Sequence, residues 1–213
     1  FISHVRHLTQ YQYNKPVSLG YNLAHLLLRD TDYQSWLNST VEVTPFQTKV
    51  HRRIDYFGNQ AYYFSLEQPH RELIVDVQTE IRIHESKYAH EMDLNLDLGT
   101  TCGEALVSLQ QSRDMAVLEA REFILDSPMI RASASLREYA RASFSRDRPL
   151  LSAVRELTHR IYEEFTYDPA STSIATPLAE VLRQKRGVCQ DFAHLAIGCL
   201  RSLGFPARYI SGY

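Results

Sequence analysis

The amino-acid sequence predicts an α+β protein in which an antiparallel β-sandwich-like domain, residues 1–85, precedes a mainly helical region, residues 126–213. In the first part, short runs of aromatic and β-branched residues are separated by turn residues, which is typical of strands. Residues 73–83 alternate, close to strictly, between a mainly apolar face and a polar one, as a half-buried strand does. In the last part, apolar residues recur at helical spacing. Residues 85 to about 111 show no clear period, and the segment between the two parts, residues 86–125, is predicted to be a connector.

The strand predicted at residues 73–83 has the clearest pattern of the first domain. Its buried face consists of Leu73, Val75, Val77, Thr79, Ile81 and Ile83. Further strands are predicted at residues 11–13, 23–29, 39–43 and 50–56. A hairpin is predicted at Phe57-Gly58-Asn59-Gln60, because Gly and Asn tolerate positive φ.

Three helices are predicted before residue 187: from Ser127-Pro128 to about Phe144, from Asp147 to Asp168-Pro169, and from Thr176-Pro177 to Arg186. Serine followed by proline is an N-cap followed by Pro at the first helical position. The second helix has an apolar stripe formed by Leu150, Val154, Leu157, Ile161 and Phe165. Its end is predicted where the Asp-Pro pair disfavours helical backbone.

Charge and hydropathy exclude several classes of protein. The formal net charge is -2, and no basic cluster of the kind that nucleic-acid binders use is present. No apolar run approaches the roughly 18 residues of a membrane span. The first residues show neither a signal-peptide core nor a cleavage site. We therefore expect neither a nucleic-acid nor a membrane partner; the sequence carries no signal for the oligomeric state.

Cysteine and histidine usage argues against a metal or disulfide framework. Three cysteines are too few and too scattered for a set of disulfides, and no CxxC pair exists for zinc. The nine histidines are spread along the chain without an HExxH pattern. We expect no metal and no cofactor, and a reducing cytoplasm is the expected compartment.

One cysteine is predicted to open a buried helix. The apolar stripe of this helix consists of Val188, Phe192, Leu195, Cys199 and Leu203. Gly204 and Pro206 end the helix. Cys189 therefore lies in the first turn, one position away from the buried stripe.

This position suits a nucleophile. The unpaired N–H groups and the positive end of the helix dipole favour a thiolate, and thiols at helix N-termini commonly have lowered pKa values. The same amides can stabilise an oxyanion on a carbonyl that the sulfur attacks. The alternative is a structural cysteine, which is the commoner role of a buried thiol.

The run Arg186-Gly187-Val188-Cys189-Gln190-Asp191-Phe192-Ala193-His194-Leu195 and the following Cys199 to Tyr213 resemble the nucleophile segment of bacterial transglutaminase-like proteins. Phe165-Thr166-Tyr167 and Thr176-Pro177-Leu178 are similar to the approach to that core. The aromatic, β-rich first domain resembles the domain that precedes the core in these proteins. The resemblance covers nearly the whole chain and marks Cys189 as the nucleophile.

The resemblance implies a papain-like fold and a Cys, His, Asp triad that acts on amide bonds. The thiolate would attack a carboxamide or peptide carbonyl of a peptide or protein substrate, and water or an amine would resolve the thioester. The family's His and Asp follow the nucleophile, and the sequence ends at Tyr213 before either, so residues 126–213 are expected to be the front part of the core. Gln190 stands where some transglutaminases have Trp, which favours hydrolysis. The alternative is a non-catalytic protein- or peptide-binding module that keeps the fold.

The other candidates near the nucleophile have simpler interpretations. His194 lies five residues after Cys189, about 140° around the helix, and is predicted to be a packing histidine. His159 precedes the nucleophile, against the family's order. Asp191 most simply complements the helix dipole; an orienting role would place an anion beside the thiolate. Tyr167 either lines the cleft or packs in the core.

The remaining predictions concern two cysteines and the last segment. Cys199 falls in the buried stripe and is predicted to be structural. Cys102 is predicted to be a loop cysteine. Residues 205–213 are predicted to form a strand that enters the catalytic sheet.

Overall fold

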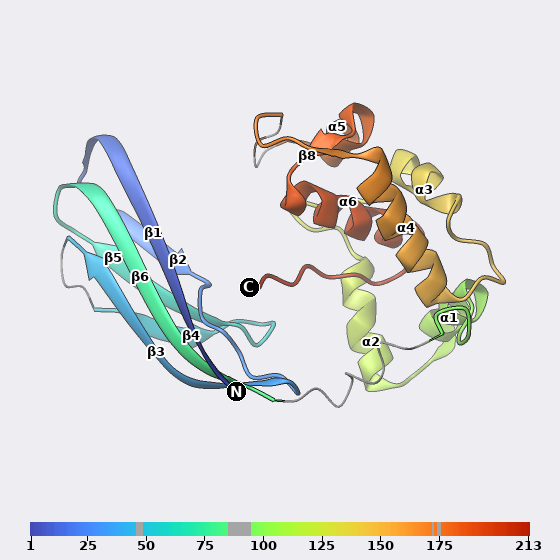
Figure 1. The fold of residues 1–213 in the computed structure, drawn as a ribbon, viewed down its shortest axis with the longest axis horizontal. Coiled ribbons are helices and arrows are strands. Elements are labelled where there is room, and N and C mark those ends of the chain that lie inside the picture. The colour runs from blue at the N-terminus through green and yellow to red at the C-terminus, as the bar shows by residue number, and fades with distance from the viewer. Residues whose placement is uncertain (46–48, 85–94, 172, 174–175) are drawn as a thin grey trace. The chain divides into compact units, whose positions relative to one another are not determined.

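The protein is described by a computed structural model that covers residues 1–45, 49–84, 95–171, 173 and 176–213 (Figure 1). The chain divides into two compact units, Phe1–Asp93 and Leu94–Tyr213. Strands form the first unit, and helices dominate the second. The predicted α+β class is therefore confirmed.

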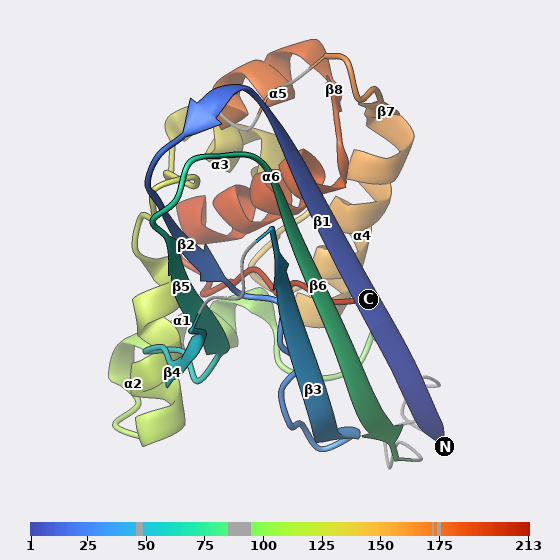
Figure 2. The same ribbon diagram turned by 90° about the vertical axis from the view of Figure 1, so that its left-hand side faces the viewer.

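The first unit consists of two three-stranded antiparallel sheets. Its strands are β1 (Ile2–Val17), β2 (Gly20–Ala24), β3 (Gln34–Thr44), β4 (His51–Ile54), β5 (Gln60–Leu66) and β6 (His70–Ile83). One sheet has the order β1-β6-β3 and the other β2-β5-β4. Figure 2 shows β1, β6 and β3 as three long neighbouring strands.

The core of this unit lies between the two sheets. Side chains of β5 pack against the inner face of β6, and the fully or nearly buried members are Phe64, Leu66, Leu73, Val75 and Val77. Burying each such side chain contributes about 1.5–3 kcal/mol. The alternation predicted for β6 is confirmed from residue 73 to residue 81, since the odd positions are buried and the even ones are not.

The predicted hairpin is the turn between β4 and β5. Gly58 has φ 76°, in the left-handed region that glycine adopts without strain. The Asp55 carboxylate accepts hydrogen bonds from the backbone N–H groups of Phe57 at 2.9 Å and Asn59 at 2.8 Å. The turn is thus fixed by an aspartate side chain as well as by glycine.

Strand β1 is the largest departure from the prediction for this unit, which placed a strand only at residues 11–13. It pairs with β6 from Ile2 to Gln12. Polar side chains on both faces hide the alternation in its sequence, and pairing with β6 overrides the weak local signal. One cross-strand pair is the ion pair of Arg6 with Asp76 at 2.7 Å. Strands β2 and β3 are also displaced or longer than predicted.

The second unit contains six α-helices, one 3₁₀ helix and a short parallel pair of strands within its described residues. They are α1 (Cys102–Gln111), α2 (Met115–Arg121), η2 (Glu122–Ile124), α3 (Ala134–Arg141), α4 (Leu150–Glu164), β7 (Thr166–Tyr167), α5 (Leu178–Gln184), β8 (Arg186–Gly187) and α6 (Cys189–Ser202). The core is built around α6, and its buried members are Leu136, Ala140, Leu157, Ile161, Phe165, Val181, Leu195 and Cys199. The predicted helix that starts at Cys189 is confirmed.

Helices α1 and α2 lie in the segment that was predicted to be a connector, residues 86–125; its residues 86–94 lie outside the described part. Helix α1 begins with a capping box. Glu104 N–H donates to Thr101 Oγ1 at 3.2 Å, and Thr101 N–H donates to Glu104 Oε2 at 2.8 Å. The pattern Thr-x-x-Glu is a known start signal, so this helix was accessible from the sequence.

The helix predicted to open at Ser127-Pro128 begins instead at Ala134. Its N-cap is Ser133, whose Oγ accepts a hydrogen bond from Leu136 N–H at 3.3 Å. Ser127 belongs to a turn in which it exchanges backbone hydrogen bonds with Ile130 at 2.9 and 3.1 Å. The prediction was wrong because Ser-Pro is equally suited to a turn.

The other corrections are shifts of helix ends and one missing strand. Helix α4 begins at Leu150 instead of Asp147, and α5 ends at Gln184, because Lys185 adopts left-handed backbone with φ 52°. Residues 205–213 form no strand. They follow α6 as an extended segment, whose Ala207 carbonyl accepts two hydrogen bonds from Arg201, at 3.0 and 2.8 Å.

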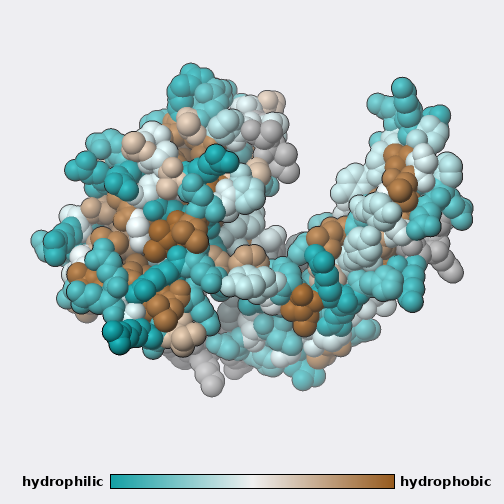
Figure 3. Space-filling model, turned by 180° about the vertical axis from the view of Figure 1, so that it is seen from behind, coloured by the Kyte–Doolittle hydropathy of each residue, from teal (hydrophilic) through white to brown (hydrophobic). Residues whose placement is uncertain are grey.

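No helix in the described part of the chain is long and apolar enough to cross a membrane. On the face shown in Figure 3, hydrophobic residues lie in separate groups between hydrophilic ones.

Candidate active site

Cys189 is the first residue of α6, and Val188 is its N-cap. The side chain of Cys189 is exposed, whereas the other two cysteines are buried. All three are free thiols. The sequence pattern indicated Cys189 at a helix start, and the structure places it at that start, exposed on the helical unit.

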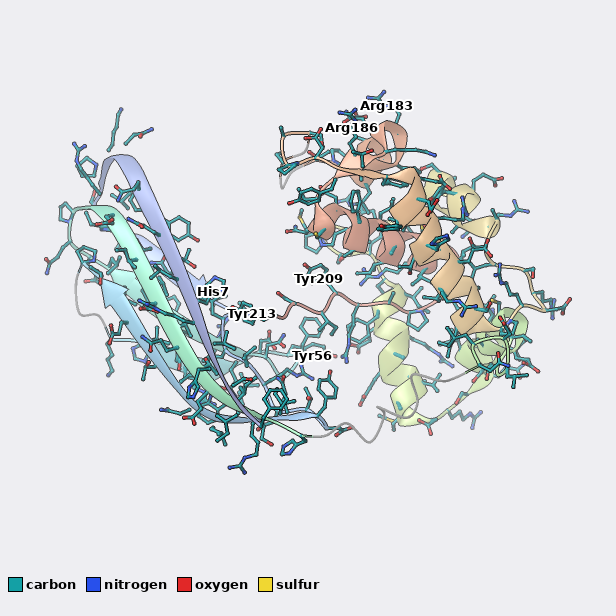
Figure 4. All side chains as sticks on the ribbon, in the orientation of Figure 1. His7, Tyr56, Arg183, Arg186, Tyr209 and Tyr213 are labelled. Atoms are coloured by element: carbon teal, nitrogen blue, oxygen red, sulfur yellow. The ribbon has the colours of Figure 1, made fainter. Side chains whose placement is uncertain are left out.

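The backbone that leads into Cys189 is held by the β7–β8 pair. Thr166 N–H donates to the Lys185 carbonyl at 2.9 Å, and Asp168 N–H donates to the Gly187 carbonyl at 2.9 Å. An ion pair between Arg186 Nη1 and Asp168 Oδ2, at 3.2 Å, supports the same pairing. Figure 4 shows Arg186 and the nearby Arg183 at this edge of the unit.

A carboxylate in the first turn of α6 holds the backbone of Val188, the residue that precedes Cys189. Asp191 Oδ2 accepts a hydrogen bond from Val188 N–H at 2.9 Å. Asp191 is buried, with 9% of its surface exposed. A Cβ atom at position 187 would lie 2.8 Å from Asp191 Oδ2 and 3.0 Å from Asp191 Cβ. Gly187 is therefore required to leave room for this carboxylate.

The N-cap of α6 is unusual in having no side-chain acceptor. Residues at this position are commonly Ser, Thr, Asp or Asn, whose oxygen binds a first-turn amide. The aliphatic side chain of Val188 cannot accept a hydrogen bond, and no side-chain cap bond is formed there. The amide of Gln190, the second residue of the helix, is thus left without an N-cap acceptor, beside the thiol.

The opposite side of α6 anchors the helix in the core. Phe192 contacts Phe165 edge-on, with ring centroids 5.8 Å apart. Leu195 and Cys199 are fully buried. Burial raises the pKa of the Cys199 thiol to about 12. The helix that carries Cys189 is consequently held by its buried stripe, and Cys199 is part of that packing.

Cys102 differs from its prediction as a loop cysteine. It is the first residue of α1 and is 3% exposed. Its N–H donates to the Arg148 carbonyl at 2.8 Å. Burial raises the pKa of its thiol as well. The two cysteines that open helices, Cys102 and Cys189, therefore differ in exposure.

The two histidines considered above, His194 and His159, contact residues other than Cys189. His194 contacts Tyr209 edge-on, with ring centroids 5.3 Å apart, and burial lowers its pKa. His159 lies on α4, 3.9 Å from Glu163, with a mostly exposed side chain. No hydrogen bond or ion pair joins Cys189 to a histidine within the described ranges. Tyr167, on β7, is 61% exposed.

No group of three or more His, Cys, Asp or Glu side chains that could hold a metal ion occurs among the described residues. The groups that the structure places around the site are a thiol, the first-turn amides and a buried carboxylate. The contact that requires Gly187 and the missing cap acceptor at Val188 could not be read from the sequence, because neither a glycine nor a valine carries chemistry that a pattern reveals. Asp191, three residues after the N-cap, was the one sequence feature that indicated its hydrogen bond with Val188 N–H.

Comparisons with known proteins agree with this architecture. Residues 3–82 match the family described as the bacterial transglutaminase-like N-terminal region, and residues 137–213 match the transglutaminase-like superfamily. An uncharacterized protein of Mycobacterium tuberculosis and one of Mycobacterium bovis are each 35% identical over 211 residues, which cover 98% of this chain and 64% of theirs. The chain thus spans 64% of the length of these relatives.

A solved structure shares the fold. It is that of a "putative cysteine protease" from Cytophaga hutchinsonii, with a TM-score of 0.71 and 19% identity over 97% of this chain and 66% of that one. An uncharacterized protein of Mycobacterium leprae is 29% identical over 98% of this chain and 70% of its own length.

Proposed function

We propose that the chain is a transglutaminase-like cysteine amidohydrolase or peptidase with Cys189 as its nucleophile, in keeping with the matches of residues 3–82 to the bacterial transglutaminase-like N-terminal region and of residues 137–213 to the transglutaminase-like superfamily. The observation that carries the proposal is the exposed Cys189 thiol in the first turn of a helix whose N-cap leaves the neighbouring amides uncapped. Backbone amides beside a thiol can donate to the oxyanion that forms when the sulfur attacks a carbonyl.

In the proposed reaction the Cys189 thiolate attacks the carbonyl carbon of an amide bond. The electron pair of the carbonyl moves to its oxygen, and first-turn amides of α6 donate hydrogen bonds to that oxyanion. The tetrahedral intermediate then expels an amine, which leaves with a proton, and a thioester remains. Water attacks the thioester, releases a carboxylic acid and restores the thiol.

Both steps need a group that moves protons. His194 and His159 face other partners, so in this proposal the proton relay is a His and an Asp outside residues 1–213, as in the triad of the family that the chain resembles. We propose hydrolysis over transamidation, since Gln190 follows the nucleophile. The substrate is proposed to be a peptide or protein amide, and a reduced thiol suits a cytoplasmic protein.

Alkylation of the folded chain tests the nucleophile directly. Limiting iodoacetamide at pH 7 is expected to modify Cys189 at least about tenfold faster than Cys102 and Cys199, because reactivity follows exposure and thiolate content. Both other thiols are buried and have raised pKa values. Mass-spectrometric peptide mapping over a time course measures the three rates, and a Cys189→Ala variant identifies the fast component. First modification of Cys102 or Cys199 would contradict the assignment.

Substituting the N-cap tests the role of the uncapped amides. Val188→Thr nearly preserves shape and adds a hydroxyl that binds a first-turn amide. It is expected to raise unfolding stability by up to about 1 kcal/mol and to lower kcat about tenfold, because the amide is no longer free for the oxyanion. Thermal unfolding and amide turnover of the full-length protein measure the two effects.

Val107→Thr provides the matched control, since Val107 is a partly exposed residue inside α1. It is expected to leave kcat unchanged. Equal or faster turnover in Val188→Thr would show that the first-turn amides take no part in the reaction.

One observation favours a second candidate function. Within the described ranges no hydrogen bond or ion pair joins a histidine to Cys189. This arrangement would suit a non-catalytic module that keeps the fold and binds a peptide or protein. Such a module would bind without turnover in the full-length protein, and Cys189→Ala would leave its binding unchanged.

A further inference from the structure

Asp191 and Gly187 form a contact that the proposed reaction does not itself require. The Asp191 carboxylate is buried at the start of α6, and its Oδ2 holds Val188 N–H at 2.9 Å. A carboxylate in the first helical turn needs no burial to interact with the dipole. Its placement against the backbone that precedes Cys189 therefore calls for a further explanation.

Gly187, the residue before Val188, leaves the space that this carboxylate occupies. Any side chain at position 187 would bring a Cβ to 2.8 Å from Asp191 Oδ2, a separation that real Cβ atoms do not show. Gly187 does not have a positive φ, so backbone conformation does not explain the glycine. The close approach of the carboxylate does.

The hydrogen bond also completes a continuous set of restraints on the backbone. The carbonyl of Lys185 is bound by Thr166 of β7, that of Gly187 by Asp168 just after β7, and the N–H of Val188 by Asp191. Cys189 follows directly, and Phe192 N–H donates to the Val188 carbonyl at 3.1 Å. Val188 is thus held on both of its peptide groups, immediately before the thiol.

We propose that Asp191 is a positioning residue for Cys189: through Val188 N–H it fixes the turn that aims the thiol, and Gly187 is present to admit its carboxylate. This inference rests on the proposed function. Misplacing a reacting group by about 1 Å can cost as much as a hundredfold in rate. The property that matters is the hydrogen-bond acceptor, so an amide in place of the carboxylate should serve almost as well.

The test compares variants of the full-length protein. Asp191→Ala removes the acceptor and is expected to lower kcat about 10- to 100-fold with KM little changed, because the thiol is misaimed while the substrate surface is retained. Asp191→Asn keeps an acceptor oxygen and is expected to stay within about threefold of the parent. The conservative variant therefore rescues activity if Asp191 acts through its hydrogen bond.

Glu104 provides a matched control. It occupies the same third position of a helix, in α1, and accepts a hydrogen bond from Thr101 N–H at 2.8 Å. Glu104→Ala is expected to lower the unfolding temperature much as Asp191→Ala does, with no change in kcat per folded molecule. If both variants lose stability and neither loses kcat, Asp191 is a helix cap only and the proposal fails.

Two more outcomes bear on the idea. Gly187→Ala is expected to lower kcat in the parent, but much less in the Asp191→Ala background, where the carboxylate that it displaces is absent. Equal effects in both backgrounds would overturn the coupling, as would an Asp191→Asn variant as slow as Asp191→Ala. A Cys189→Ala variant that keeps its turnover would sink the proposed function instead, so the two failures are distinguishable.

Discussion

Cys189→Ala is expected to reduce amide hydrolysis by the full-length protein by at least about 10³-fold, since the nucleophile and its partners act as a unit and loss of the nucleophile removes the covalent route. Cys189 lies on the surface of α6, so the substitution removes no core packing. The unfolding temperature is accordingly expected to change little. Turnover of a peptide-amide substrate and a thermal melt of the same preparation measure the two quantities.

Cys102→Ala is the control for this experiment, because Cys102 is a buried thiol at another helix start. It is expected to keep kcat per folded molecule while it lowers stability. Residues 1–213 alone are expected to hydrolyse amides at background level, since general acid–base catalysis contributes about 10²–10⁴-fold and no histidine is bound to Cys189 in the described part of the chain. Robust, Cys189-dependent turnover by those residues alone would make His194 or His159 the base.

Leu157→Ala is expected to destabilise the helical unit by about 2–5 kcal/mol, because the substitution leaves a cavity and loses apolar burial. Leu157 is 1% exposed and packs in the core around α6. The same substitution at Leu151, on the same helix but 53% exposed, is expected to cost less than about 1 kcal/mol. Urea unfolding followed by circular dichroism compares them. Equal losses would mean that α4 does not pack on α6 as described.

The sequence predicted the elements whose local pattern and tertiary environment agree. Strand β6 has a nearly strict alternation and is buried on one face from residue 73 to residue 81, and α6 carries its apolar stripe on the side that meets the core. Strand β1 was mostly missed, because what stabilises it is pairing with β6 and not its own pattern. Ser127 was misassigned because a serine before proline suits both a helix start and a turn.

For the site, the sequence supplied Cys189 but not the contacts around it. The stripe of α6 indicated which residue opens the helix, and that follows from spacing alone. The Gly187–Asp191 contact depends on a distance between two backbone segments, which spacing does not contain. The missing cap arises because the side chain of Val188 has no hydrogen-bond acceptor. A single sequence does not show that this valine is the N-cap residue.

The two segments that flank α6 should respond differently to acid. Before the helix, Glu164 binds Lys185 Nζ at 2.7 Å and Arg160 Nε at 3.2 Å, and these bonds lower the pKa of its carboxyl. The stability from that lowered pKa is present above the unfolded pKa and is lost as the pH falls through the folded one.

After the helix, the buried Arg201 side chain donates to the carbonyls of Ala207 and Leu125 and to the hydroxyl of Ser127. None of these acceptors titrates, and none is an ion whose attraction salt would screen. Acidification should therefore release the chain that enters the helix first, while the chain that leaves it stays in place.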